Sequence, residues 1–228
     1  MNTALVIAAH PDDEVLGCGA TIARLIYEGW AVHVVIVAEG ATSRNVSRDL
    51  VLDKLELSGL AKCAEVANGL LGATSIKLHS LPDNRMDGLE LLDIVKIVEA
   101  EIACHQPCMV MTHHSGDVNI DHRILHDAVI AACRPQPGHP VRTLLFFEVP
   151  SSTEWRPTAS GFQFSPNYFF DVTDFLEAKL LALGAYAAEM RPYPHPRSIQ
   201  GVEYLARWRG VTIGSMAAEA FVLGRAIL

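Results

Sequence analysis

Five short apolar runs, separated by segments with helical spacing, constrain the fold of this chain more than any other feature. The runs are bounded by turn residues, and they span residues 3–9, 31–38, 76–81, 109–112 and 143–149. A continuous apolar run of this length is typical of a strand that is buried on both faces. Because these strands alternate with helices, the chain is predicted to have an α/β fold with a doubly wound, mainly parallel sheet. The expected strand order is 3-2-1-4-5.

The predicted helices of this core cover residues 15–28, 49–67 and 89–104, and a fourth helix ends near Cys133. After residue 150 the sequence pattern changes, and a stretch rich in Ser, Pro and Gly predicts a surface loop. An edge strand is expected over 168–172, a helix over 174–190, and a further helix near residues 218–228. With no internal repeat, residues 1–228 are expected to form one domain: a core over 1–150, then a substrate loop and a C-terminal helical extension over 151–228.

Composition excludes several classes of protein. Hydrophobic residues make up 50% of the 228 residues and charged residues 19%, which excludes a disordered chain. The formal net charge of −8 argues against a nucleic-acid partner. Five cysteines without framework spacing predict free thiols and a cytoplasmic location. No apolar stretch approaches the roughly 18 residues that a membrane helix needs, so we expect no membrane insertion.

The most polar loops follow the first and fourth predicted strands, which are neighbours where the strand order reverses. Ligands of open parallel sheets bind beyond the carboxyl ends of the strands at this point. The first loop carries His10, Asp12, Asp13 and Glu14, and the second carries His122. Imidazole and carboxylate groups are the ligands of a catalytic zinc, which keeps one position open for water. One aspartate of the adjacent pair can bind the metal while the other acts as a general base.

Other side chains belong to the same edge of the sheet. Arg44 and Arg85, in the loops after the second and third strands, are candidates for substrate binding or for structural salt bridges. Asp117, in the loop after the fourth strand, is assigned to substrate binding. His195 projects from the stiff, proline-rich segment RPYPHPRS. This segment is either a plain connector or a rigid support from which His195 stabilises an oxyanion or protonates a leaving amine.

The segments HPDDEVLGCGATIARL (residues 10–25) and GDVNIDHR (residues 116–123) together resemble the GlcNAc-phosphatidylinositol de-N-acetylase family, the LmbE-like zinc amidohydrolases. The resemblance implies a Rossmann-like fold, one Zn²⁺ per subunit and removal of acetyl from N-acetylglucosamine-type groups. By motif position it implies that His10, Asp13 and His122 bind the metal and that Asp12 is the general base.

One position departs from the family pattern. Thiol-cofactor members commonly have His-Pro-Asp-His where this chain has Asn-Ile-Asp-His at 119–122. Asn119 can donate a hydrogen bond but cannot carry a proton, so His195 is the candidate replacement as electrophilic assistant. Some relatives receive such a histidine from a neighbouring subunit. The apolar C-terminal segments, 175–183 and 221–228, therefore lead us to expect a homo-oligomer.

The expected activity is zinc-dependent removal of acetyl from a small-molecule N-acetylated amino sugar or its conjugate, in glycan, glycoconjugate or secondary-metabolite biosynthesis. Three alternatives stay open at this point. A non-catalytic sugar-nucleotide binding module would need no metal. A site with two histidines and one carboxylate also suits iron and redox chemistry. Finally, an amidase could act on a different acyl group.

Overall fold

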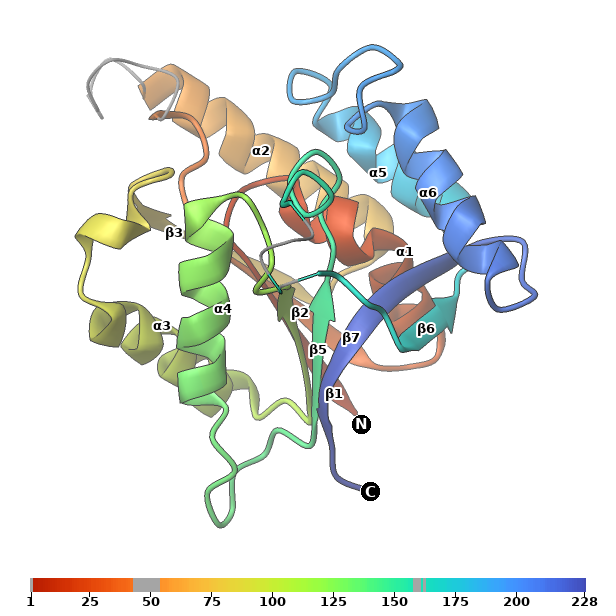
Figure 1. Cartoon of the computed structure of the whole chain (residues 1–228). Helices are drawn as coiled ribbons and strands as arrows, with labels where there is room; N and C mark the ends of the chain where they lie inside the picture. The colour runs from red at the N-terminus through yellow and green to blue at the C-terminus, as the bar shows by residue number, and fades with distance from the viewer. Residues whose placement is uncertain (1, 43–53, 158–160, 162) are drawn as a thin grey trace.

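The computed structural model describes residues 2–42, 54–157, 161 and 163–228. Its centre is a seven-stranded sheet with strand order β3-β2-β1-β4-β5-β7-β6 (Figure 1). The first five strands pair in parallel, which confirms the predicted order 3-2-1-4-5. Their bounds are β1 (Thr3–Ala8), β2 (Ala31–Ala38), β3 (Ser75–Leu81), β4 (Met109–His113) and β5 (Thr143–Phe147).

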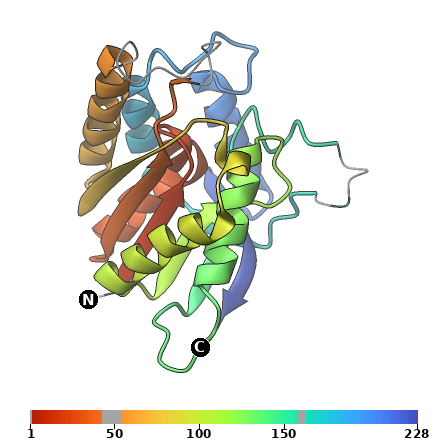
Figure 2. The same cartoon turned by 90° about the vertical axis from the view of Figure 1, so that its left-hand side faces the viewer.

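Helices cover both faces of the sheet (Figures 1 and 2). One layer contains α1 (Asp13–Tyr27), α2 (Lys54–Leu71), α5 (Leu176–Ala185) and α6 (Ile199–Val211). The other contains α3 (Leu91–His105) and α4 (Ile120–Ala132), with the short 3₁₀ helix η2 (Met86–Gly88) beside α4. No helix among the described residues is both long and apolar enough to cross a bilayer.

The strand β1 shows why the central strands are apolar on both sides. Ala4, Val6 and Ala8 pack into the core beneath α1, α2 and α5. Leu5 and Ile7 pack into the core beneath α3 and α4. Because neighbouring side chains of a strand point to opposite faces, a sheet covered on both faces needs apolar residues at successive positions.

The C-terminal region corrects one prediction. Residues near 218–228 form no helix but the strand β7 (Ala218–Ala226), which pairs antiparallel with β5 and with β6 (Tyr168–Asp171). The prediction of a helix near residues 218–228 is therefore wrong. The last helix before β7 is α6, which lies earlier in the chain. Burial does not alternate along the start of β7. Its first four residues are all buried, and they include the polar Glu219 as well as the apolar Phe221.

Packing within the chain accounts for much of the apolar C-terminal sequence. Leu183 of α5 and Phe221 of β7 are fully buried in the core that also contains α1. This intramolecular core holds most of the apolar residues between 175 and 183 and those at the start of β7.

Helix α1 is broken near its first turns, and a buried ion pair supports the break. Cys18 has non-helical dihedral angles (φ −148°, ψ 24°). Lys179 donates from Nζ to the carbonyl of Leu16 (2.8 Å) and pairs with Glu219 (2.5 Å). Glu219 in turn accepts hydrogen bonds from the backbone N–H groups of residues 20 and 21. These side chains therefore satisfy backbone groups that an unbroken helix would pair internally.

Candidate metal centre and active site

The loops after β1 and β4 bring the predicted metal ligands together at the carboxyl end of the sheet. The two chain termini lie at the opposite end (Figure 1). His10 and Asp13 come from the turn between β1 and α1, and His122 comes from the first turn of α4. All three residues are buried, with at most 9% of each exposed. Residues that lie more than 100 positions apart in the sequence thus form one polar cluster.

The three side chains present one ligand atom each to a common centre. Asp13 Oδ2 lies 3.3 Å from His10 Nδ1 and 3.1 Å from His122 Nε2. The three ligand atoms all lie within 4.8 Å of one another. Two imidazole nitrogens and one carboxylate oxygen are a donor set that catalytic zinc and non-haem iron both use, with a coordination position left open.

A carboxylate stands behind each histidine of this set. Asp121 Oδ2 lies 3.0 Å from His10 Nε2, and Asp117 Oδ2 lies 3.0 Å from His122 Nδ1. Such carboxylates fix the orientation and the tautomer of a histidine that binds metal. Asp121 is itself held because its carboxylate accepts hydrogen bonds from the backbone N–H groups of residues 84 and 86.

Asp117, which the sequence analysis assigns to substrate binding, is enclosed behind His122. Its side chain is fully buried, and it accepts hydrogen bonds from the hydroxyls of Ser152 and Thr153 and from the backbone N–H of Asn119. These donors and His122 hold the pKa of Asp117 at about 2, even though burial raises it. The carboxylate of Asp117 thus contacts His122 and these donors, and Asp117 is not among the residues that line the cavity over the ligand cluster.

Two observations show that the cluster fits a divalent cation. Both ring nitrogens of His122 are buried and make no hydrogen bond of acceptable geometry, although Asp13 lies close to Nε2 and Asp117 lies close to Nδ1. Burial lowers the pKa values of His10 and His122, yet the surrounding carboxylates raise them to about 10 and about 9. The cluster therefore attracts positive charge, which a metal ion supplies without protonating the ligands.

A second group, formed by His10, Asp83 and Asp121, also has metal-ligand spacing. It uses the other nitrogen of the same His10 ring, at 3.2 Å from Asp83 and 3.0 Å from Asp121. Because Asp121 already accepts two backbone hydrogen bonds, this group is better suited to orient His10 than to bind a second ion.

Asp12 lies beside the ligand cluster but is not part of it. Its backbone is in the left-handed region (φ 99°), a conformation that costs a non-glycine residue about 1–3 kcal/mol. The Asp12 N–H donates to Glu14 Oε2 (3.1 Å), and Glu14 Oε1 accepts from Tyr186 and Asn68. Burial raises the pKa of Asp12 well above its usual range, while Arg197 opposes the shift. In this turn the side chain of Asp13 joins the ligand cluster, whereas that of Asp12 pairs with Arg197.

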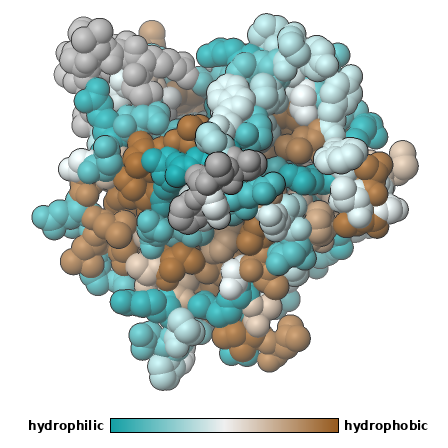
Figure 3. Space-filling view, in the orientation of Figure 1, coloured by the Kyte–Doolittle hydropathy of each residue, from teal (hydrophilic) through white to brown (hydrophobic). Residues whose placement is uncertain are grey.

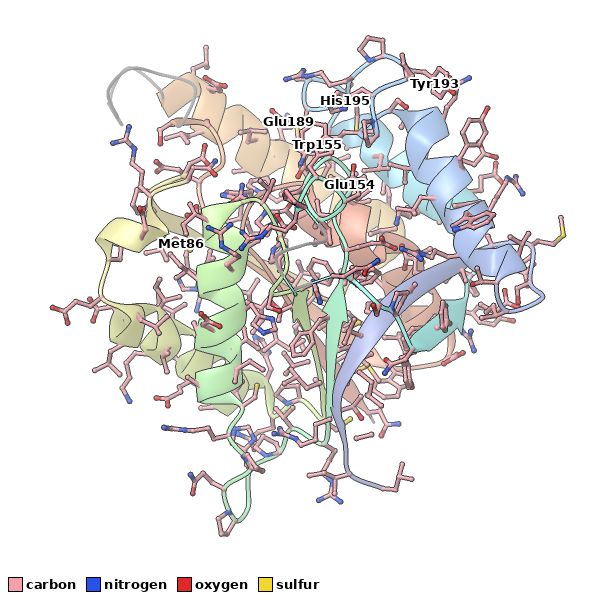
Figure 4. The ribbon with its side chains drawn as sticks, in the orientation of Figure 1. Met86, Glu154, Trp155, Glu189, Tyr193 and His195 are labelled. Carbon is pink, nitrogen blue, oxygen red and sulfur yellow. The ribbon has the colours of Figure 1, made fainter. Side chains whose placement is uncertain are left out.

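The proline-rich segment before α6 contributes a residue that the sequence analysis did not select. Arg197 Nη1 donates to Asp12 Oδ2 (2.9 Å), and Arg197 Nε donates to Ser151 Oγ (3.2 Å). His195 packs edge-on against Trp155, with ring centroids 5.6 Å apart, and its Nδ1 accepts from the backbone N–H of Arg197 (Figure 4). Arg197, not His195, is thus among the residues that line the cavity over the ligand cluster.

The other predicted site residues differ in whether they line the cavity. Asn119 lines the cavity, and its Oδ1 caps α4 by accepting from the backbone N–H of Asp121 (2.8 Å). Arg85 is exposed on the loop after β3 and is not among the cavity-lining residues. Arg44 lies outside the described residues.

The cavity has a volume of about 120 Å³ and an almost wholly polar lining. Asp83, Asn84 and Glu189 line it in addition to the residues above, and sequence reasoning assigned no role to them. Asp83 and Asn84 directly precede Arg85, so the polar loop at 82–87 was the available signal. On the face drawn in Figure 3, hydrophilic surface lies between apolar patches. A small polar cavity of this kind suits a hydrophilic group of a substrate.

Comparisons with known proteins agree with this geometry. The chain is 31% identical to the uncharacterized deacetylase YaiS of Escherichia coli (strain K12) over 185 residues, which cover 78% of this chain and 87% of that protein. The crystal structure of N,N'-diacetylchitobiose deacetylase from Pyrococcus horikoshii superposes with a TM-score of 0.77 at 21% identity, covering 98% of this chain and 84% of that chain.

The same fold also occurs in an enzyme of another reaction class. GalB of Pseudomonas putida KT2440, a 4-carboxy-2-hydroxymuconate hydratase, superposes with a TM-score of 0.78 at 20% identity, covering 100% of this chain and 98% of that chain. At such identities the two solved structures establish the fold alone.

A family model supplies the assignment that the fold alone does not. The model described as PIG-L, GlcNAc-PI de-N-acetylase, matches residues 5–133, which include both loops of the ligand cluster. With this match and the similarity to the Escherichia coli deacetylase, the chain belongs to the PIG-L (GlcNAc-PI de-N-acetylase) family.

Proposed function

We propose that this protein is a zinc-dependent hydrolase that removes the acetyl group from an N-acetylglucosamine-type sugar or sugar conjugate. The observation that carries the proposal is the different placement of two adjacent aspartates in the loop after β1. Asp13 joins His10 and His122 in a set of three ligands, while the adjacent Asp12 stays outside the set and faces the cavity. Three ligands with a neighbouring carboxylate base are the arrangement of metal-assisted amide hydrolysis.

The residues of this chain have distinct parts in the proposed reaction. A zinc ion held by His10, Asp13 and His122 would lower the pKa of a water molecule and polarise the acetyl carbonyl. Asp12 has one carboxylate oxygen paired with Arg197, which leaves Oδ1 to take the proton of the attacking water. Asp12 then returns this proton to the nitrogen of the departing amine. His195 and Asn119 are the residues that the sequence predicts to stabilise the oxyanion.

The substrate class rests on the relatives and on the cavity. The Pyrococcus horikoshii enzyme is named for a diacetylated amino sugar, and the cavity of this chain is small and polar. We propose that the acetamido group enters the cavity while the rest of the sugar conjugate lies on the surrounding loops. Arg85, exposed on one of these loops, is proposed to contact that outer part, as is Arg44.

The proposal places the enzyme in glycan, glycoconjugate or secondary-metabolite biosynthesis in the cytoplasm. All five cysteines are unpaired, as expected in a reducing compartment.

The direct test is acetate release from a panel of N-acetylhexosamines, their glycosides and their nucleotide-linked forms, with zinc-loaded protein. We expect acetate and free amine in equal amounts from at least one member. An amide series with formyl, propionyl and butyryl groups would identify an amidase of different acyl preference. A hydratase would instead add water to an unsaturated acid such as 4-carboxy-2-hydroxymuconate and release no acetate. No acetate from any panel member would contradict the proposal.

A further inference from the structure

The cavity needs a hydrogen-bond donor for the oxygen that becomes negative during amide hydrolysis, and Asn119 and His195 each meet this need only in part. Asn119 accepts at Oδ1 to cap α4, and its Nδ2 is a neutral donor that brings no positive charge to an oxyanion. His195 is turned toward Trp155 and its own backbone, and it does not line the cavity. In Figure 4 it lies on the segment between Tyr193 and α6, above Trp155.

Arg197 meets the requirements that these two residues do not meet. Among the described residues that line the cavity, it is the one side chain with a permanent positive charge. Its guanidinium is fixed at two points, by Asp12 Oδ2 at 2.9 Å and by Ser151 Oγ at 3.2 Å. Its side chain is 22% exposed, which leaves it accessible from the cavity but largely removed from water.

The geometry of the guanidinium leaves donors for a substrate. Of its five N–H groups, the contact with Ser151 uses the one on Nε, and the contact with Asp12 uses one of the two on Nη1. Although burial lowers the pKa of Arg197, nearby Asp12, Asp13 and Glu189 raise it, so the group stays charged close to the ligand cluster. A fixed, charged donor in a water-poor site stabilises developing negative charge most effectively.

We propose that Arg197 is the catalytic residue that donates a hydrogen bond to the carbonyl oxygen of the acetyl group as that oxygen becomes an oxyanion. This inference rests on the proposed deacetylase function. As the water oxygen bonds to the acetyl carbon, the C=O electron pair moves to the oxygen, and Arg197 stabilises it without transferring a proton. When the C–N bond breaks, the pair reforms C=O, and the amine leaves with the proton that Asp12 carried. Acetate and amine are the products.

The test compares Arg197→Gln and Arg197→Lys with Arg191→Gln, a matched control in the same segment. Arg191 is exposed, and its side chain contacts backbone carbonyls outside the cavity. For each variant we would measure zinc content, kcat and KM on the best panel substrate. We would also measure by calorimetry the affinity for a methylphosphonamidate analogue, whose tetrahedral, negatively charged phosphorus resembles the transition state.

We expect Arg197→Gln to retain zinc and to lower kcat by about 10²–10³-fold. KM should change by less than about threefold, and binding of the phosphonamidate should weaken by a factor similar to that in kcat/KM. Arg197→Lys keeps the charge but not the fixed geometry, so it should recover about tenfold over Gln. Arg191→Gln should match the wild type.

A double-mutant cycle separates direct contact from an effect through Asp12. In an Asp12→Asn background, Arg197→Gln should still weaken phosphonamidate binding, because the proposed contact is with the oxyanion itself. Loss of that effect, a change confined to KM, or a large fall in kcat for His195→Asn but not for Arg197→Gln would overturn the inference. Each of these results presupposes an active wild type, whereas no acetate release by the wild type would overturn the proposed function instead.

Discussion

Helix α1 has buried charges at its N-terminus and beneath its break, and the two regions differ in how well these charges are matched. Beneath the break, Lys179 and Glu219 pair one to one, and both also bind backbone groups of α1. At the N-terminus, Asp12 pairs with Arg197, whereas the ion-pair partners of Asp13 among the described residues are histidines. His122 Nε2 is also left without a hydrogen bond there.

This difference separates a structural cluster from a site that binds something. A buried charge is tolerated when an opposite charge and hydrogen bonds compensate its loss of hydration. The Lys179–Glu219 pair reaches this state within the chain. The cluster of His10, Asp13 and His122 reaches it when a cation is added. Substitutions in the Lys179–Glu219 pair should therefore change mainly the stability of the protein. Substitutions in and around the ligand cluster should change mainly its activity and metal affinity.

The largest expected effect is on activity, from Asp12→Asn. The variant should retain zinc and a near-normal melting temperature but lose about 10²–10⁴-fold in kcat, because the amide cannot accept the proton of the water. Acetate release and zinc analysis measure the two properties. Asp93→Asn, on the exposed side of α3, is the matched control and should behave as the wild type. If Asp12→Asn hydrolyses as fast as the wild type, Asp12 is not the general base.

A large effect on stability is expected from Lys179→Met. This substitution leaves Glu219 buried without its counter-charge, which costs about 3–5 kcal/mol in the free energy of unfolding. Lys96→Met, which removes an exposed pair with Glu99, should cost less than about 1 kcal/mol. Urea unfolding measures both variants. Equal costs would show that the buried pair does not support the break in α1.

A smaller effect is expected from Asp117→Asn, which removes the charge behind His122. Zinc affinity should fall by about 10–100-fold, because loss of a carboxylate that orients a metal ligand weakens binding by this amount. Competition with a chelator measures it, and Asp127→Asn, exposed on the same helix, provides the control. An unchanged affinity would show that Ser152 and Thr153, rather than His122, account for the burial of Asp117.

The smallest expected effect is on the pH dependence of stability. Burial lowers the pKa of His114 from its usual 6.5 to about 4. Between these values the unfolded chain binds a proton that the folded chain does not bind, so stability should fall as pH decreases from about 6.5 to about 4. With zinc held constant, His114→Gln should show a shallower fall in melting temperature over this range than the wild type. Parallel curves would assign the acid sensitivity to other groups.

The sequence predicts the parallel core well because each buried strand is an apolar run between turn residues. β1 and β2 lie within a residue of their predicted bounds. β7 escapes the same reasoning, since its strand identity depends on pairing with β5, and it carries the buried Glu219 for the break in α1. A helix pattern and a strand pattern are difficult to distinguish in so short a segment.

Prediction of the site from the sequence is limited in the same way, because local patterns do not contain tertiary contacts. Adjacent motif residues with distinct chemistry, such as His10 and Asp13, could be selected from residue type and spacing. The roles of Asp117 and Arg197 depend on which way a loop turns its side chains, and no local pattern contains that information. Arg197 lies two residues from the predicted His195, so the segment was identified correctly while the side chain that reaches Asp12 was not.

The most direct test of the central claim is a zinc titration of metal-free protein, followed by acetate release from the best amino-sugar substrate. A cluster completed by one cation predicts no activity without metal, a linear rise with added zinc, and a plateau at one equivalent per chain. His122→Ala should abolish both the binding and the rise. Acetate release that persists in the metal-free protein, or that is unaffected by His122→Ala, would contradict the account.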